Sequence, residues 1–143
     1  STVDSLNRLA AAGIKRSVMI INGVGGKKFS TQHAENSALL ANKTQPEFLA
    51  ALVLNLPHGE ERFQAGYHGK FIRMDQHERF IELRTFMAGL ELKSTIFRSD
   101  HASNQLVLRG TLGKDKERLL KEIDTAIMTP EQANLRAEWI RPF

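Results

Sequence analysis

The chain has 143 residues, with 20 lysines and arginines against 16 aspartates and glutamates, which gives a formal net charge of +4. This length suits a single unit, residues 1–143, with a real hydrophobic core. No segment approaches the ~20 apolar residues that cross a bilayer. The N-terminus lacks the basic and apolar segments of a secretory signal peptide. We therefore expect a cytoplasmic protein with no membrane partner.

The absence of cysteine excludes several classes of site from this chain. It rules out disulfides, thiolate zinc sites, a cysteine nucleophile and iron–sulfur clusters held by cysteine. The five histidines do not have the spacing of metal ligands, so we expect no metal site. Basic residues alternate with acidic ones over Lys114–Glu122, as on a solvated helix face, so nucleic acid is not an expected partner.

Hydrophobic spacing predicts two helices and two strands in the first half of the chain. These are a helix over Asp4–Ala12, a strand over Arg16–Ile21, a helix from Ser30 or Thr31 to Asn42, and a strand over Phe48–Asn55. A glycine-rich loop, residues 22–26, follows the first strand. The second strand is apolar on both faces, which is typical of a parallel sheet covered by helices.

The second half begins with a long connection, Leu56–Met74, which is long enough to carry a function or a short helix. Asp75 and Glu78 predict a capping box at the start of a helix, with an apolar stripe through Phe80, Leu83, Met87 and Leu90. The remaining predicted elements are a strand over Lys93–Phe97, a polar loop over Arg98–Gly113, a helix over Lys114–Met128, and a short helix capped by Thr129 with Pro130 at its first position.

Alternating helices and strands predict an α/β fold of parallel βα units, with three main strands flanked by helices. Three strands are few for such a sheet, and a first element that is helical is unusual for this class. Both features indicate part of a larger β/α architecture.

Ligands of parallel β/α folds lie beyond the carboxyl ends of the strands, where three loops are expected: Asn22–Lys28, Asn55–Glu61 and Arg98–Asn104. The first loop can hold an anion on its backbone N–H groups, or it is only a tight turn with two exposed lysines. The second offers His58 beside paired carboxylates for acid–base chemistry, or it is a solvated helix start. The third is a polar site or a hydrogen-bonded loop that closes the fold.

The third loop carries a recognisable phrase. Thr95–Asn104 and Leu108–Leu120 resemble the C-terminal end of radical SAM (S-adenosylmethionine) proteins that are labelled Fe–S oxidoreductases. Four other segments are similar to that family: Val18–Gly26, the motif Ser30-x-x-His33-Ala34, Phe48–Leu56, and the ending from Thr129-Pro130-Glu131 to Trp139. The resemblance implies a (β/α) barrel whose first strand is followed by Cys-x-x-x-Cys-x-x-Cys, the motif that holds a [4Fe–4S] cluster.

The resemblance implies that this cysteine-free chain is the C-terminal half of such a barrel and that its partner is the missing N-terminal half. The whole protein would use S-adenosylmethionine and a [4Fe–4S] cluster on an unidentified small or macromolecular substrate. Neither cofactor is expected on this chain alone, which would be inactive. Its first strand, Ser17–Ile21, would be a free sheet edge through which copies of the chain could pair as a homodimer.

The family also suggests site residues. Its motif Gly-x-Ile-x-Gly-x-x-Glu contacts the adenine of S-adenosylmethionine; here Ile21 and Gly23 match, while Met19 and Gly26 occupy the first and last positions. Seven residues are implied near this cofactor: Ile21, Asn22, Gly23, Gly25, Leu54, Asn55 and Leu56. Five are implied at the barrel mouth: Arg98, Ser99, Asp100, His101 and Asn104. No catalytic residue is assigned.

Two other interpretations remain open. The chain could be a stand-alone α/β module that binds a phosphate or nucleotide through its glycine-rich loop. It could also be a protein-interaction domain whose mixed-charge helices contact a partner.

Overall fold

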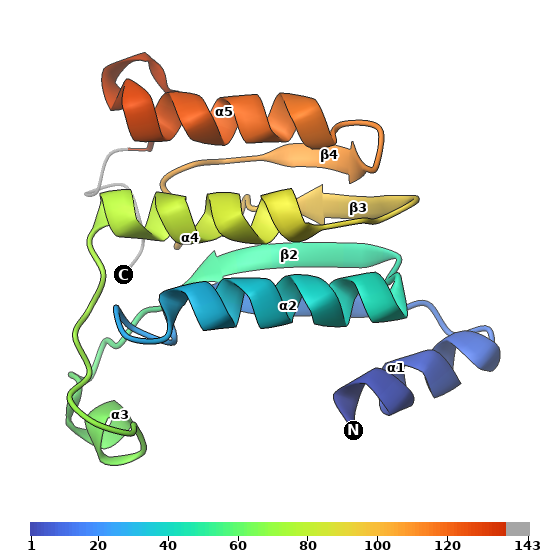
Figure 1. The fold of residues 1–143 in the computed structure, drawn as a ribbon, viewed down its shortest axis with the longest axis horizontal. Coiled ribbons are helices and arrows are strands. Elements are labelled where there is room, and N and C mark those ends of the chain that lie inside the picture. The colour runs from blue at the N-terminus through green and yellow to red at the C-terminus, as the bar shows by residue number, and fades with distance from the viewer. Residues whose placement is uncertain (137–143) are drawn as a thin grey trace.

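A computed structural model describes residues 1–136 (Figure 1). Its elements are α1 (Thr2–Ala11), β1 (Ser17–Asn22), α2 (Ser30–Thr44), β2 (Phe48–Val53), α3 (Glu61–Ala65), α4 (Gln76–Gly89), β3 (Thr95–Arg98), β4 (Arg109–Leu112), α5 (Lys116–Met128) and a short 3-10 helix, Pro130–Gln132. The predicted capping box is present, since Asp75 and Glu78 each accept a hydrogen bond from the other's backbone N–H. Trp139, part of the resemblance, lies outside the described residues.

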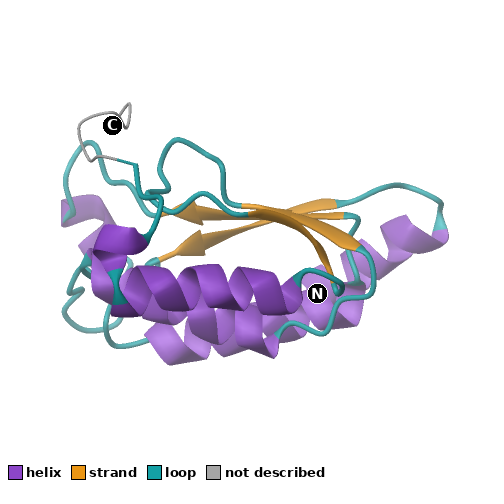
Figure 2. Cartoon of the chain, turned by 90° about the horizontal axis from the view of Figure 1, so that it is seen from above, coloured by secondary structure: helices purple, strands orange, loops and turns teal. Residues whose placement is uncertain are grey.

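One mixed sheet organises the fold, with strand order β1-β2-β3-β4. The first three strands are parallel and β4 runs antiparallel to β3. The helices α2, α4 and α5 all lie on one face of this sheet (Figure 2). The predicted α/β class with parallel βα units is therefore confirmed.

The prediction of three strands and a polar loop over Arg98–Gly113 is wrong, because β4 lies inside that segment. Its sequence, Arg109-Gly-Thr-Leu112, has only one large apolar side chain, so the period-two signal of a half-buried strand is weak. Leu112 faces the core and is 1% exposed. Pairing with β3, rather than local pattern, makes this segment a strand.

The hydrophobic core lies between the sheet and the three helices. Leu49 of β2 and Phe97 of β3 point into it, against Phe86 and Met87 of α4 and Leu119 of α5. The helix α2 contributes only small side chains, Ala34, Ala38 and Ala41. These let it lie close to α4, where a Cβ added to Gly89 would be 3.1 Å from the Cβ of Ala38.

The opposite face of the sheet carries no helix within the described residues (Figure 2). We call it the open face and define it by the exposed side chains Met19 and Ile21 of β1, Phe48 of β2, and Ile96 and Arg98 of β3. Met19 is 66% exposed, whereas Leu49 on the helix face is 1% exposed. Within the described residues, the predicted helix cover of the second strand therefore exists on one face alone: on the other face Phe48 is 41% exposed.

Within residues 1–136 the first strand is an edge strand, as the resemblance implied, because β2 is the one strand with which β1 pairs there. The preceding helix α1 contributes no buried residue. Figure 1 shows it extending away from the sheet at the amino ends of the parallel strands.

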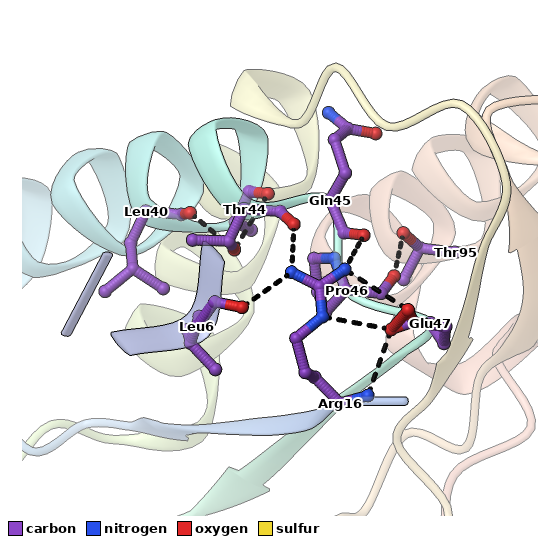
Figure 3. Close-up of polar contacts among 9 residues, drawn as sticks. Leu6, Arg16, Leu40, Thr44, Gln45, Pro46, Glu47 and Thr95 are labelled. Carbon is purple, nitrogen blue, oxygen red and sulfur yellow. Dashed lines mark hydrogen bonds and ion pairs between the residues drawn. The ribbon is translucent and has the colours of Figure 1, made fainter. Parts of the chain in front are cut away.

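A buried arginine fastens this amino end (Figure 3). The guanidinium of Arg16 donates hydrogen bonds to the carbonyl oxygens of Leu6, Thr44 and Gln45. It also forms a two-pronged ion pair with the carboxylate of Glu47, with N···O distances of 3.2 Å. Arg16 is 6% exposed, so one buried side chain joins α1, β1 and the connection before β2, while the side chain of Glu47 is 36% exposed.

Candidate functional site

The carboxyl ends of β1 and β2 meet, as the predicted site requires. The backbone N–H of Leu54 donates to the carbonyl oxygen of Asn22 at 2.9 Å. A Cβ added to Gly23 would touch the Cβ of Leu54 at 3.8 Å. The long connection with α3 leaves this same end of the sheet (Figure 1). The first two predicted loops therefore form one region.

Within this region, the residues at the end of β1 face different ways. Ile21 is 42% exposed on the open face. Asn22 is buried and its side-chain N–H₂ donates to the carbonyl oxygen of Arg79 on α4, at 3.0 Å. Gly23, with φ of 92°, donates its N–H to Oε2 of Glu82 at 2.6 Å. Asn22 and Gly23 thus tie β1 to α4, while Ile21 remains available to a ligand.

Glu82 is the residue that sequence reasoning missed. It is 3% exposed, and burial raises the pKa of its carboxyl group; the Gly23 amide, nearby His33 and Ser30 act in the opposite direction. Oε1 of Glu82 and Oδ1 of Asn22 have no hydrogen-bond partner within the described part of the chain. The sequence feature that could have indicated a buried Glu82 is its position four residues before Phe86, which places both residues on the buried side of α4.

The glycine-rich loop is held by its own backbone. Val24 donates its N–H to Ile21, Gly26 to Gly23, and Lys27 to Ile72. Gly26 has φ of 63°, and a Cβ there would meet the ring of Phe71 at 2.9 Å, so only glycine fits. Because these N–H groups are occupied and the Glu82 carboxylate lies behind Gly23, the geometry gives no support to a phosphate cradle.

Four aromatic rings pack over this loop and order the long connection that follows β2: Phe29, Phe63, Tyr67 and Phe71. The Tyr67 hydroxyl donates to the carbonyl oxygen of Gly25 at 2.6 Å. Gly25, implied as a cofactor contact, is therefore fixed by a side chain from the α3 region.

The end of β2 offers more accessible groups. Leu54 and Leu56 are half-buried and Asn55 is exposed. Next to them an open, mainly apolar pocket of about 460 Å³ is lined by Leu56, Pro57, His58, Gly59, Arg62 and Phe63. Two residues of the second predicted loop therefore line this pocket: Leu56, implied near the cofactor, and His58, offered for acid–base chemistry.

The third predicted loop largely has a structural role. β3 pairs only with the first half of β2, so the second half needs other partners. Asn104 donates its side-chain N–H₂ to the carbonyl oxygen of Ala51 at 2.9 Å, and Ser103 Oγ accepts the N–H of Val53 at 3.1 Å. Ser99 Oγ donates to the carbonyl oxygen of Leu106 and accepts the N–H of Leu108. These contacts favour the interpretation of a loop that closes the fold.

The other members of this loop lie nearer the surface. His101 Nδ1 and Ser103 Oγ are 2.9 Å apart, so the imidazole helps to hold the same turn. Asp100 forms an ion pair with Arg109, with a distance of 3.2 Å from Oδ2 to Nε. Arg98 projects from the open face. The five predicted barrel-mouth residues therefore do not converge on one cavity.

No group of three or more histidine, aspartate or glutamate side chains that could hold a metal ion occurs within residues 1–136. The helices of this described part are all too short or too polar to cross a membrane. Comparison of the chain with protein-family models, with curated proteins and with solved structures gives no match. The resemblance to radical SAM proteins stays a prediction.

Proposed function

We propose that this chain is the C-terminal part of a radical SAM-type (β/α) barrel, to which it contributes cofactor and substrate contacts. The observation that carries the proposal is the arrangement of the parallel strands. β1, β2 and β3 follow one another in the sheet, with their crossover helices on one face. The proposal includes a cytoplasmic location.

This arrangement favours a barrel sector over an open doubly wound sheet. Crossovers between parallel strands are right-handed, so a strand order that never reverses places every helix on the same side. A doubly wound sheet reverses its strand order and has helices on both faces. In a barrel the helices lie outside and the other face of the sheet lines the interior. The open face, with Met19, Phe48 and Ile96, has the apolar character of such an interior.

The free edge of β1 supports the same proposal. A barrel has no edges, so a sector of one needs a neighbouring strand at this position. The missing N-terminal half is the partner we propose for this edge. Pairing of two copies through β1 is the expected substitute in the isolated chain.

The residues fit the two implied cofactors unequally. The chain has no cysteine, so its residues do not fit the [4Fe–4S] cluster, and that group must be held elsewhere in the whole protein. The fit to S-adenosylmethionine is partial: Ile21, Leu54 and Leu56 offer apolar surface to an adenine ring, and Asn55 offers an exposed amide. With its cluster, this cofactor supplies the hydrogen-abstraction chemistry of the family. In this proposal, the residues of this chain bind S-adenosylmethionine, orient it and exclude water from it.

The test is to join this chain to the segment encoded upstream of it and to reconstitute the product anaerobically. We expect the longer polypeptide to bind a cluster and to cleave S-adenosylmethionine, while the 143-residue chain does neither. Ile21→Asp should weaken binding of S-adenosylmethionine to the longer polypeptide by about tenfold or more, since a charge would replace the apolar contact.

Ile81→Asp is the matched control, because Ile21 is 42% and Ile81 44% exposed and only Ile21 lies on the open face. Equal effects of the two variants would argue against the assigned site. Cleavage of S-adenosylmethionine by the isolated chain, or a longer polypeptide that holds no cluster, would overturn the proposed function.

A further inference from the structure

We propose that the open face binds a small amphipathic anion, a carboxylate or phosphate attached to an apolar body, with Arg98 as the residue that pairs with its charge. This inference rests on the proposed function, in which the open face lines the substrate chamber, and it names the class of substrate.

Two arginines face each other across β3 and β4, since Arg98 lies directly opposite Arg109 in the antiparallel register. Residues directly opposite one another project from the same face of a sheet, and like charges in this position are unfavourable. Phe97, the neighbour of Arg98, is fully buried on the helix face, so both guanidinium groups belong to the open face.

Negative charge is scarce beside Arg98 and Arg109. Asp100 pairs with Arg109, with 3.2 Å between Oδ2 and Nε. Within residues 1–136, no hydrogen bond or ion pair to the guanidinium of Arg98 is present. The Asp100 carboxylate therefore pairs with Arg109 and leaves Arg98 without a counter-ion within residues 1–136, and an added anion would relieve the repulsion between the two arginines while it makes charge-assisted hydrogen bonds.

Apolar surface lies beside Arg98 on the open face. Across the sheet its register partner on β2 is Ala50, whose own partner on β1 is Met19. The small side chain of Ala50 therefore lies between two long ones. Phe48 and Ile96 lie one step further along the same face and are 41% and 37% exposed. A ligand with an apolar body can lie over Ala50 while its anionic group reaches Arg98.

The position of Arg98 in the fold agrees with a ligand contact. It is the last residue of β3. Ligands of β/α folds bind at the carboxyl ends of the strands. The same positive charge argues against a second copy as the occupant of the open face. Packing two open faces together would bring Arg98 and Arg109 of both copies to one interface, where each pair of arginines has the single carboxylate of Asp100 within residues 1–136.

The experiment uses the four methionines as probes in the 143-residue chain. With ¹³C-labelled methionine methyl groups, decanoate and decyl phosphate are titrated below their micelle-forming concentrations. Met19 is 66% exposed on the open face and Met128 is 79% exposed on α5. We expect saturable shifts of the Met19 signal and none of Met128. Decyltrimethylammonium, with the same chain and the opposite charge, should bind at least tenfold more weakly.

Arg98→Gln should weaken binding of decanoate and decyl phosphate by about tenfold, and Arg98→Lys should restore part of it, because lysine keeps the charge but not the planar fork. Arg84→Gln, which removes an exposed arginine on α4 paired with Asp124, is the control and should have no effect. The Met87 signal, from a side chain with 0% exposure, reports whether each variant remains folded.

The inference is overturned if Arg98→Gln binds both anions as tightly as the unchanged chain, or if the ammonium probe binds equally well. It is also overturned if Met128 responds as strongly as Met19, or if shifts occur only above the micelle-forming concentration, which would indicate a lipid surface. None of these outcomes involves a cluster, so the inference can fail while the radical SAM assignment stands. Anion binding with no cysteine motif upstream would leave the inference and remove the assignment.

Discussion

At the amino end of the sheet, one guanidinium joins three segments of the chain: Arg16 contacts the carbonyl oxygens of Leu6 and Thr44 and the carboxylate of Glu47 (Figure 3). At the carboxyl end, by contrast, the connections are long and two buried acceptors, on Asn22 and Glu82, have no partner within residues 1–136. The first end has the satisfied polar network of a scaffold. The second has the exposed loops and unsatisfied groups that accompany binding sites.

The proposed (β/α) barrel accounts for this difference, because in such barrels the amino ends of the strands stabilise the fold and the carboxyl ends carry the chemistry. It predicts that substitutions at the amino end lower stability and that substitutions at the carboxyl end separate into structural and functional ones.

Among the substitutions of polar side chains, the largest expected effect belongs to Arg16→Met. Arg16 is 6% exposed, and its removal leaves the carbonyl oxygens of Thr44 and Gln45 without these donors, which costs about 3 kcal/mol for the two acceptors together. Chemical denaturation measures the change. Hydrogen bonds from Arg16 hold the pKa of Glu47 below its ordinary value, so this carboxylate stabilises the fold above that value and loses the contribution as pH falls.

Arg84→Met is the control for this prediction, because both members of its ion pair with Asp124 are 44% exposed. Such surface pairs contribute about 0–1 kcal/mol. Similar losses in the two variants would contradict the assignment of the amino end as the scaffold.

Asn104→Ala has the next largest expected effect on the free energy of unfolding. It leaves the carbonyl oxygen of Ala51 without its donor in a buried setting, which costs about 1–3 kcal/mol. The exposed Asn55, at the same end of the sheet, provides the control, and Asn55→Ala should change the free energy of unfolding by about 0.5 kcal/mol or less. If Asn104→Ala left stability unchanged, the closing role of the third loop would be wrong and a direct ligand role would be favoured.

Glu82→Gln tests the buried carboxyl group. Because burial raises its pKa, the ionised form is disfavoured in the folded state, and the contribution of Glu82 to stability falls as pH rises above the ordinary value of 4.5. Glutamine keeps an acceptor for the Gly23 N–H and removes the charge. The difference in free energy of unfolding, variant minus unchanged chain, should therefore grow between pH 4.5 and pH 8.

Glu35→Gln, at an exposed position on α2, is the control variant measured in the same pH series. A difference for Glu82→Gln that does not change with pH would contradict this prediction and would show that the Glu82 carboxyl group is solvated in solution.

Met19→Ser has the smallest expected effect, about 0.5 kcal/mol or less, because its side chain is 66% exposed on the open face. Leu49→Ala, on the helix face of the neighbouring strand, should cost about 2–5 kcal/mol. A loss above about 1 kcal/mol for Met19→Ser would mean that the open face of the isolated chain is covered, as in a dimer.

Much of the fold follows from local pattern. The capping box at Asp75 and the apolar stripe of α4 specify that helix, and the glycine-rich break after Asn22 marks the end of β1. β4 could not be found in this way, because Arg109-Gly-Thr-Leu112 becomes a strand only through its pairing with β3. Likewise, the apolar pattern of Phe48–Val53 does not reveal that one face has no cover in the described chain.

The candidate site was predictable to a smaller extent. The carboxyl-end rule located the region, and Ile21, Leu54 and Leu56 lie in it. The rule did not separate side chains that point outwards, such as Ile21, from inward ones. Asn22 and Asn104 point inwards and donate hydrogen bonds to backbone carbonyl oxygens. The partner of an amide is set by tertiary packing, and polar composition alone carries no information about it.

The measurement that tests the central claim most directly is the coding sequence upstream of Ser1. The account predicts an open reading frame of about 150 residues or more, roughly the length of another domain, with Cys-x-x-x-Cys-x-x-Cys after its first strand. A start codon immediately before Ser1 would leave no upstream segment to carry the cysteine motif and would contradict the account.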